Sequence, residues 1–361
     1  MKIIAISDLH LTLKESYGVT TSDGLNSRVK DKLSALSKAV DYAVNNNANL
    51  FIDAGDTFDI LNPPELLRYK FIEAITPLFR NNIPIIIIMG NHVYNATYYN
   101  LQSEELLLKY ISDSKMEIIS KPVTRKINNI SFTFMPWNYI DEAEKYFKEH
   151  PNTIVFHHLP IKNAILNSYE VKSKEGLDDS TLKSQAFFIG GHYHMHQVND
   201  NYCYIGSLVK QDFGEREQKK GFIELNVKED LTSLDLNFIE IKDRDFIQLD
   251  FIEPTDPIDY LKSVDTFKES IIKSSFTGSK QWLYNINKTE YLKTLELKGA
   301  MRVLQPEYID SEEPIKKSNT LSSSGSFEEH IQYYCKEKNR TDCEELMLNI
   351  LKEVQNTRKI I

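Results

Sequence analysis

The chain has 361 residues, of which 41% are hydrophobic and 26% charged, and its formal net charge is −9. These values exclude a disordered, a collagen-like and a disulfide-scaffold chain, and the length predicts two domains or one large domain with an appendage. The three cysteines form no C-x-x-C pair, so we expect no cysteine zinc site and a reducing, cytoplasmic compartment.

Up to about residue 190, short apolar runs alternate with amphipathic stretches. The runs are rich in Ile, Val or Phe, which is typical of strands buried on both faces. They are residues 3–6, 50–54, 85–89, 153–156 and 186–189. No apolar run approaches the ~20 residues that a membrane helix needs. Because the first strand leads directly into polar residues, we also expect no secretory leader.

Two amphipathic helices are predicted between the first three strands. Apolar residues recur at three- and four-residue steps from Val29 to Ala43, and Ser27 is the expected N-cap. The second helix is expected to begin near Pro63 and to run to Phe79. Strands that alternate with helices predict a layered α/β domain, and antiparallel segments such as residues 130–135 predict that its sheet is mixed.

The pattern changes after about residue 250, where we expect a small α+β domain. It is predicted to contain a helix over 259–273, a strand near 282–286, a further helical stretch and a strand over 300–304. Residues 280–302 carry five basic and two acidic residues. A solvated face is the ordinary interpretation of such a segment, and contact with DNA is the alternative.

The C-terminal part differs again in composition. Residues 310–325 are polar and Ser-rich, which is typical of a linker. Residues 326–361 contain two capping-box patterns and an apolar stripe, which predict a helical tail. The stripe either covers its own domain or enters a groove of a partner, and the linker before it favours the partner.

Each predicted buried strand is followed at once by polar residues of metal-binding type. In chain order they are Asp8 and His10, Asp56 and Asp59, Asn91 and His92, His157 and His158, and His192 and His194. The carboxyl ends of strands form the ligand crevice of an open α/β sheet, so we expect these loops to converge. Imidazole and carboxylate suit Mn, Fe, Zn or similar ions, and we count seven of these ten residues as candidate ligands, a number that suits two ions better than one. Two ions about 3.5 to 4 Å apart favour in-line attack on phosphorus.

The ordered set D-x-H, G-D-x-x-D, G-N-H, H and G-H-x-H resembles the calcineurin-like metallophosphoesterase superfamily. The resemblance implies two groups of metal ligands that share Asp56 as a bridge. One group is Asp8, His10 and His194, and the other is Asn91, His157 and His192. It also implies that His92 contacts the scissile phosphate or protonates the leaving group, and that Asp59 orients ligands from outside the coordination sphere.

One position departs from the superfamily pattern. An acidic residue usually follows G-N-H and orients its histidine, but here that position is Val93. Either another carboxylate takes its place or His92 is less well tuned. His158 and His196 each stand beside a stronger candidate, so we expect both to lie outside the ligand set or at the surface.

A narrower resemblance covers the segment YIGSLVKQDFGEREQKKGF, residues 204–222. It is similar to the G-S … G-E … K-G-F segment of the nuclease subunits of SbcCD-type DNA repair and recombination complexes, including bacteriophage versions. This resemblance implies a nuclease domain over 1–250, a DNA-contacting capping domain over 251–309, a linker over 310–325 and a tail over 326–361. The tail would bind the coiled coil of an SMC-like ATPase.

The resemblance further implies a DNA exonuclease and endonuclease that uses two divalent ions, Mn²⁺ first, with Mg²⁺, Fe²⁺ or Zn²⁺ as alternatives. It implies a homodimer formed through helices near residues 66–79 and 101–111. Two rival functions stay open. A phosphatase or small-molecule phosphodiesterase of the same superfamily would leave the residues beyond about 240 unexplained. A non-catalytic adaptor for the ATPase would be expected to have an incomplete ligand set.

Overall fold

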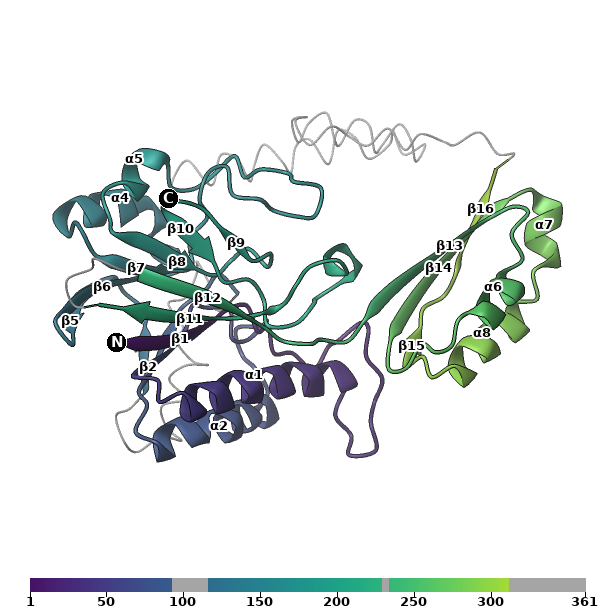
Figure 1. Ribbon diagram of the computed structural model, residues 1–361, viewed down its shortest axis with the longest axis horizontal. Helices are drawn as coiled ribbons and strands as arrows, with labels where there is room; N and C mark the ends of the chain where they lie inside the picture. Colours follow the sequence, from purple (N-terminus) through teal and green to yellow (C-terminus); the bar gives the residue numbers. More distant parts are fainter. Residues whose placement is uncertain (93–115, 229–233, 312–361) are drawn as a thin grey trace, which may run out of the picture. The chain divides into compact units, whose positions relative to one another are not determined.

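The computed structural model describes residues 1–92, 116–228 and 234–311 (Figure 1). Five sequence predictions fall outside these residues. They concern Val93, the helix expected over 101–111, the linker, the two capping boxes and the apolar stripe of the tail.

The first sheet has six strands in the order β12-β11-β1-β2-β3-β4. The four strands from β1 to β4 run parallel, and β11 and β12 add an antiparallel edge beside β1. The bounds are Lys2–Ile6 for β1, Leu50–Asp53 for β2, Ile85–Ile88 for β3, Met116–Ile119 for β4, Gly221–Val227 for β11 and Leu234–Glu240 for β12.

The second sheet also has six strands, in the order β5-β6-β7-β8-β10-β9. Its four central strands are parallel, and β5 and β9 pair antiparallel at the two edges. The bounds are Val123–Ile127 for β5, Ile130–Met135 for β6, Ile154–His157 for β7, Phe187–Gly190 for β8, Gln197–Val198 for β9 and Tyr202–Tyr204 for β10. Both sheets are mixed, as the sequence predicts.

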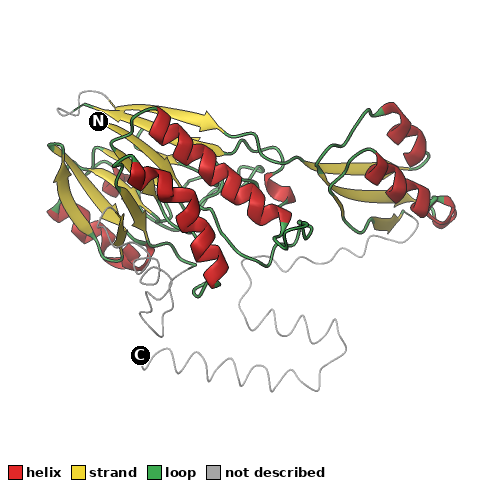
Figure 2. Ribbon diagram, turned by 90° about the horizontal axis from the view of Figure 1, so that it is seen from below, coloured by secondary structure: helices red, strands yellow, loops and turns green. Residues whose placement is uncertain are grey.

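The two sheets pack face to face, and helices cover their outer faces (Figures 1 and 2). The core between the sheets is built from residues such as Ile52 of β2 and Phe156 of β7. Helices α1 (Ser27–Asn45) and α2 (Glu65–Arg80) cover the first sheet. On the second sheet lie α4 (Ile140–Glu149), which follows the short η1 (Trp137–Tyr139), and α5 (Asp179–Leu182). The result is the predicted layered α/β fold.

The predicted helices of this domain form close to the expected bounds. Helix α1 is capped one residue earlier than predicted, because the Asn26 side chain accepts a hydrogen bond from the Arg28 backbone N–H at 2.9 Å. The hydroxyl of Ser27 instead accepts from the backbone N–H of Val19. Helix α2 follows Pro64, and such a position suits proline because no intrahelical N–H is lost there.

A third sheet follows, in which β14 (Ile271–Gly278) pairs with β13, β15 and β16. The remaining bounds are Phe213–Glu215 for η2, Phe246–Ile252 for β13, Pro257–Ser263 for α6, Lys280–Asn285 for α7, Lys288–Leu297 for α8, Arg302–Val303 for β15 and Glu307–Asp310 for β16.

Two local predictions are wrong in the segment that contains the third sheet. The expected helix over 259–273 ends at residue 263 and gives way to β14, and the expected strand near 282–286 is α7. Helix α7 forms because Ser279 caps it by accepting from the Trp282 backbone N–H.

The chain divides into two compact units. The first contains residues 1–249, 257–274 and 287–306, and the second contains, among the described residues, 250–256, 275–286 and 307–311. The domain bounds implied by the sequence stay a prediction. Within the described part of the chain, no helix has both the length and the apolar character that crossing a bilayer requires.

Candidate metal centre

The predicted polar loops meet because their strands are parallel neighbours. Strands β1, β2 and β3 are adjacent in the first sheet, and β7 and β8 are adjacent in the second. Several of these loops turn sharply directly after the strand. Asp8, His10, Asp56 and His192 all have positive φ, at 52°, 48°, 55° and 94°. Such backbone is sparsely populated by residues with side chains and is concentrated at functional sites.

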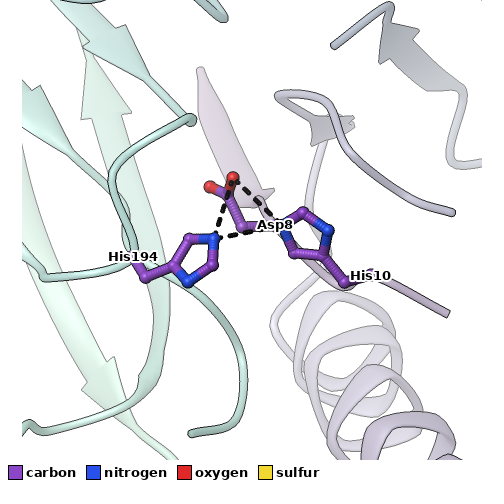
Figure 3. Close-up of side chains that lie close together, drawn as sticks. All are labelled: Asp8, His10 and His194. Carbon is purple, nitrogen blue, oxygen red and sulfur yellow. Dashed lines mark hydrogen bonds and ion pairs between the residues drawn. The ribbon is translucent and has the colours of Figure 1, made fainter. Parts of the chain in front are cut away.

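One group of donors is formed by Asp8, His10 and His194 (Figure 3). The Nε2 atoms of the two histidines are 3.1 Å apart. Oδ1 of Asp8 lies 3.8 Å from Nε2 of His10 and 4.0 Å from Nε2 of His194. Donors from the loop after β1 and from a loop more than 180 residues later therefore face one point.

A second group surrounds Asn91. Its Oδ1 lies 3.1 Å from Nε2 of His158 and 3.1 Å from Nδ1 of His192. Oδ2 of Asp56 lies 3.1 Å from the same Nε2 of His158. The backbone N–H of His192 donates to the carboxylate of Asp8, which joins this group to the first.

Asp56 lies between the two groups. Its Oδ2 is 3.1 Å from Nε2 of His158 and 3.9 Å from Nε2 of His10. Glycines let the backbone approach it this closely, since a Cβ at Gly90 would lie 2.1 Å from Oδ1 of Asp56. The Asp56 carboxylate is therefore close to donors of both groups.

His157 is not among the donors of either group, and its assignment as a ligand stays a prediction. Its ring is fully buried beside Phe188 and Tyr204, and its Nδ1 accepts from the Leu159 backbone N–H at 3.0 Å. Its neighbour His158, which was expected outside the ligand set, takes the place beside Asp56 and Asn91. The sequence held a signal for the side of the sheet that each ring faces. Side chains alternate along a strand, and His158 shares its parity with Phe156 of the inter-sheet core, whereas His157 shares that of Val155 on the outer face.

His92 and Asp59 form a pair at the edge of the site. Oδ1 of Asp59 lies 3.1 Å from Nδ1 of His92 and 3.3 Å from Nδ1 of His10. The side chains of His92 and Asp59 are both 37% exposed, whereas those of Asp8, His10 and Asp56 are buried. Among the described residues, Asp59 is thus a carboxylate in the place to orient His92, which favours the first of the two alternatives raised by Val93.

Electrostatics at the site reflect this crowding of imidazole and carboxylate. Burial lowers the pKa of His157 to about 3 and that of His192 to about 4. Burial also opposes charge on His158, but the carboxylate of Asp56 outweighs it and raises the pKa of His158 to about 9. For His92, the hydrogen bond that its ring donates to Asp59 outweighs burial and raises the pKa to about 9. The negative charge of Asp56 thus favours the protonated form of His158.

The donor set fits divalent cations. Nδ1 of His194 lies 2.7 Å from a carboxylate oxygen of Glu215, and Nδ1 of His10 faces Asp59. Neutral rings with a proton on Nδ1 present two Nε2 lone pairs to each other at 3.1 Å, an arrangement that a cation between them stabilises. Nitrogen and oxygen donors without thiolate suit first-row divalent ions.

Comparison with known proteins agrees with this geometry. Residues 1–196 match the family model described as calcineurin-like phosphoesterase. The DNA double-strand break repair protein Mre11 of Sulfolobus acidocaldarius is 24% identical over 356 residues, which cover 92% of this chain and 81% of that protein. Exonuclease subunit 1 of Enterobacteria phage T4 is 24% identical over 62% of this chain and 63% of its own length.

An SbcCD nuclease subunit of Staphylococcus saprophyticus is 25% identical over 63% of this chain and 66% of its own length. The family match covers all the loops that carry the candidate ligands, from Asp8 to His194. The chain belongs to the calcineurin-like phosphoesterase family and is a metal-dependent phosphoesterase.

Proposed function

We propose that the chain is the nuclease subunit of an SbcCD-type complex, a Mn²⁺-dependent DNA exonuclease and endonuclease that works with an SMC-like ATPase in double-strand-break repair or recombination. The observation that carries the proposal is the convergence of two donor groups on Asp56 in a chain whose relatives include a break repair protein and two nucleases. The first of these relatives aligns with 92% of the chain, so the likeness extends beyond the catalytic domain.

Two divalent ions would be held by the donor groups, with His158 in place of His157. Asp8, His10 and His194 would hold one, Asn91, His158 and His192 the other, and Asp56 both. When bound, such ions neutralise phosphate charge and lower the pKa of water toward neutrality. Because that neutralisation is local, an acidic protein can still act on DNA.

The chain's own residues would position the scissile phosphate and supply a proton. His92 is the most exposed of the candidate histidines of known placement near Asp56, with Nε2 3.9 Å from Oδ2 of that residue. Because Asp59 engages its Nδ1, the Nε2–H is left to face the substrate. His92 would donate this proton to the 3′ oxygen as the P–O bond breaks and water adds to phosphorus.

The proposal also covers the assembly. Residues 326–361 would bind the ATPase, residues 251–309 would contact DNA, and two copies would pair through α2, on which Leu66 and Tyr69 are 46% and 53% exposed. A DNA substrate and a soluble ATPase partner would place the work of the complex in the cytoplasm.

The test is cleavage of labelled linear single- and double-stranded DNA by the purified chain with Mn²⁺, beside a small phosphodiester. We expect degradation of DNA that EDTA abolishes. Asp56→Ala should lose both metal and activity, whereas His92→Ala should keep its metal and lose most cleavage. Turnover of the small ester without any attack on DNA would favour the small-molecule phosphodiesterase, and no hydrolysis of either substrate would favour the adaptor.

A further inference from the structure

Glu215 is a buried carboxylate that contacts the ring of His194, on the side of the ring away from the other donors of the candidate metal centre. It ends η2 and is 8% exposed. Its Oε1 lies 2.7 Å from Nδ1 of His194. Its Oε2 lies 2.7 Å from Nζ of Lys220 and accepts from the Gln211 backbone N–H at 2.9 Å. With both oxygens engaged, the carboxylate has a fixed orientation.

Lys220 contacts both the carboxylate of Glu215 and the backbone of His194. It is 2% exposed, and its Nζ lies 2.9 Å from the backbone carbonyl of His194 and 2.9 Å from Oγ of Ser207. The backbone N–H of Ser207 donates to that same carbonyl at 3.1 Å. His194 is therefore held both at its ring, by Glu215, and at its backbone, by Ser207 and Lys220.

These contacts connect Glu215 to the face that a metal would use. The Nδ1 of His194 that meets Glu215 is opposite the Nε2 that faces His10 and Asp8. A carboxylate at Nδ1 keeps the proton of the neutral ring on that nitrogen and leaves the Nε2 lone pair free. Carboxylates in this position orient the histidine and strengthen it as a ligand.

We propose that Glu215 is a positioning residue for His194, which fixes the ring's tautomer and aim, and that Lys220 in turn fixes Glu215. This inference rests on the proposed metal centre and deepens it. It gives a role to the segment over residues 204–222, in which Ser207, Glu215 and Lys220 surround the last histidine of the ligand set. The competing interpretation is a buried ion pair that supports the fold alone.

A matched pair of variants separates the two interpretations. Glu215→Gln removes the charge at the site, and Glu224→Gln removes it from a glutamate of equal 8% exposure on β11 whose partners are Lys2, Tyr42 and Asn226. We expect Mn²⁺ to bind Glu215→Gln about 10- to 100-fold more weakly than the wild type, and Glu224→Gln as tightly as the wild type. Binding is measured by titration followed by electron paramagnetic resonance.

A second readout uses the metal-free protein. Long-range ¹H–¹⁵N spectra, with His194 assigned through His194→Gln, should show the Nδ1–H tautomer in the wild type and in Glu224→Gln. In Glu215→Gln the Nε2–H form should become populated. If Glu215→Gln fails to fold, the double variant Glu215→Gln/Lys220→Met removes the stranded lysine charge and should show the same changes.

Wild-type Mn²⁺ affinity in Glu215→Gln or in the double variant, an equal loss in Glu224→Gln, or an unaltered His194 tautomer would overturn the inference. Neither readout involves DNA. A wild type that binds Mn²⁺ and does not cut DNA would therefore refute the proposed substrate and leave the role of Glu215 standing.

Discussion

At the scale of single residues, the neighbouring His157 and His158 face opposite sides of the second sheet. Both histidines follow the same buried strand, so their position in the sequence makes both candidates. The choice depends on which side of the second sheet each side chain faces, and that follows from strand parity. Strand parity assigns the two side chains to opposite faces of the sheet. It shows which of them faces the candidate site only when the inner face of the strand is known.

The same substitution at both positions tests this assignment. Asparagine places an oxygen near the position of Nδ1 and has no equivalent of Nε2. In His158→Asn we expect Mn²⁺ binding to weaken by more than about 10-fold, because Nε2 faces Asp56 and Asn91.

In His157→Asn the acceptor for the Leu159 N–H remains. We therefore expect an affinity within about twofold of the wild type and a loss of about 0.5 to 3 kcal/mol in the free energy of unfolding. Calorimetric titration and chemical denaturation measure the two quantities. The opposite pattern of affinities would identify His157, and not His158, as the ligand.

Asp59 shows a different limit of the sequence. The resemblance implies that Asp59 orients ligands, but nothing local in the sequence shows which histidine it would orient. The structure places its carboxylate near both His10 and His92. Glu215 could not be assigned a role at all, because its partner His194 is 21 residues away and the contact depends on the fold of η2.

At the scale of elements, the sequence predicts the catalytic domain well. Its strands are continuous apolar runs and its helices have clear apolar periodicity, so local pattern and tertiary burial agree. The segment from 253 to 304 was less predictable. Its elements are short. The segment IIKSSFTG forms β14 by pairing with β15 and β16, whose paired residues lie 31 or 32 positions further along the chain.

An ion pair that joins α1 to the segment before β13 offers a test at this scale. Arg244 contacts both carboxylate oxygens of Asp31 at 2.7 Å, and its side chain is 14% exposed. Lysine cannot form this two-pronged contact. We expect Arg244→Lys to lower the free energy of unfolding by about 1.5 to 3 kcal/mol.

The control is Arg216→Lys, since Arg216 is 35% exposed and pairs with Glu217 at 3.5 Å. We expect its free energy of unfolding to change by less than about 0.5 kcal/mol in denaturant titrations. Equal effects of the two substitutions would mean that the contact between Arg244 and Asp31 does not support the position of α1.

At the scale of the whole molecule, the order of the ligand loops along the chain predicts their convergence. The reason is physical, because parallel strands place their carboxyl ends along one edge. The residues that follow the third sheet lie beyond what the structure describes, so the role of the tail stays a proposal.

Deletion of residues 326–361 tests that proposal. We expect the shortened chain to keep Mn²⁺-dependent cleavage, because every candidate ligand lies before residue 195, and to lose co-purification with a co-expressed coiled-coil ATPase of the SbcC type. The full-length chain is the control. Undiminished capture of the ATPase by the shortened chain would show that another surface makes the contact.

The central claim is that five loops enclose two cations around Asp56. Anomalous diffraction from crystals soaked in Mn²⁺ tests it most directly. We predict two peaks about 3.5 to 4 Å apart on either side of the Asp56 carboxylate, one beside His10 and His194 and the other beside His158 and His192. A single peak remote from Asp56, or no peak at saturating Mn²⁺, would contradict the account.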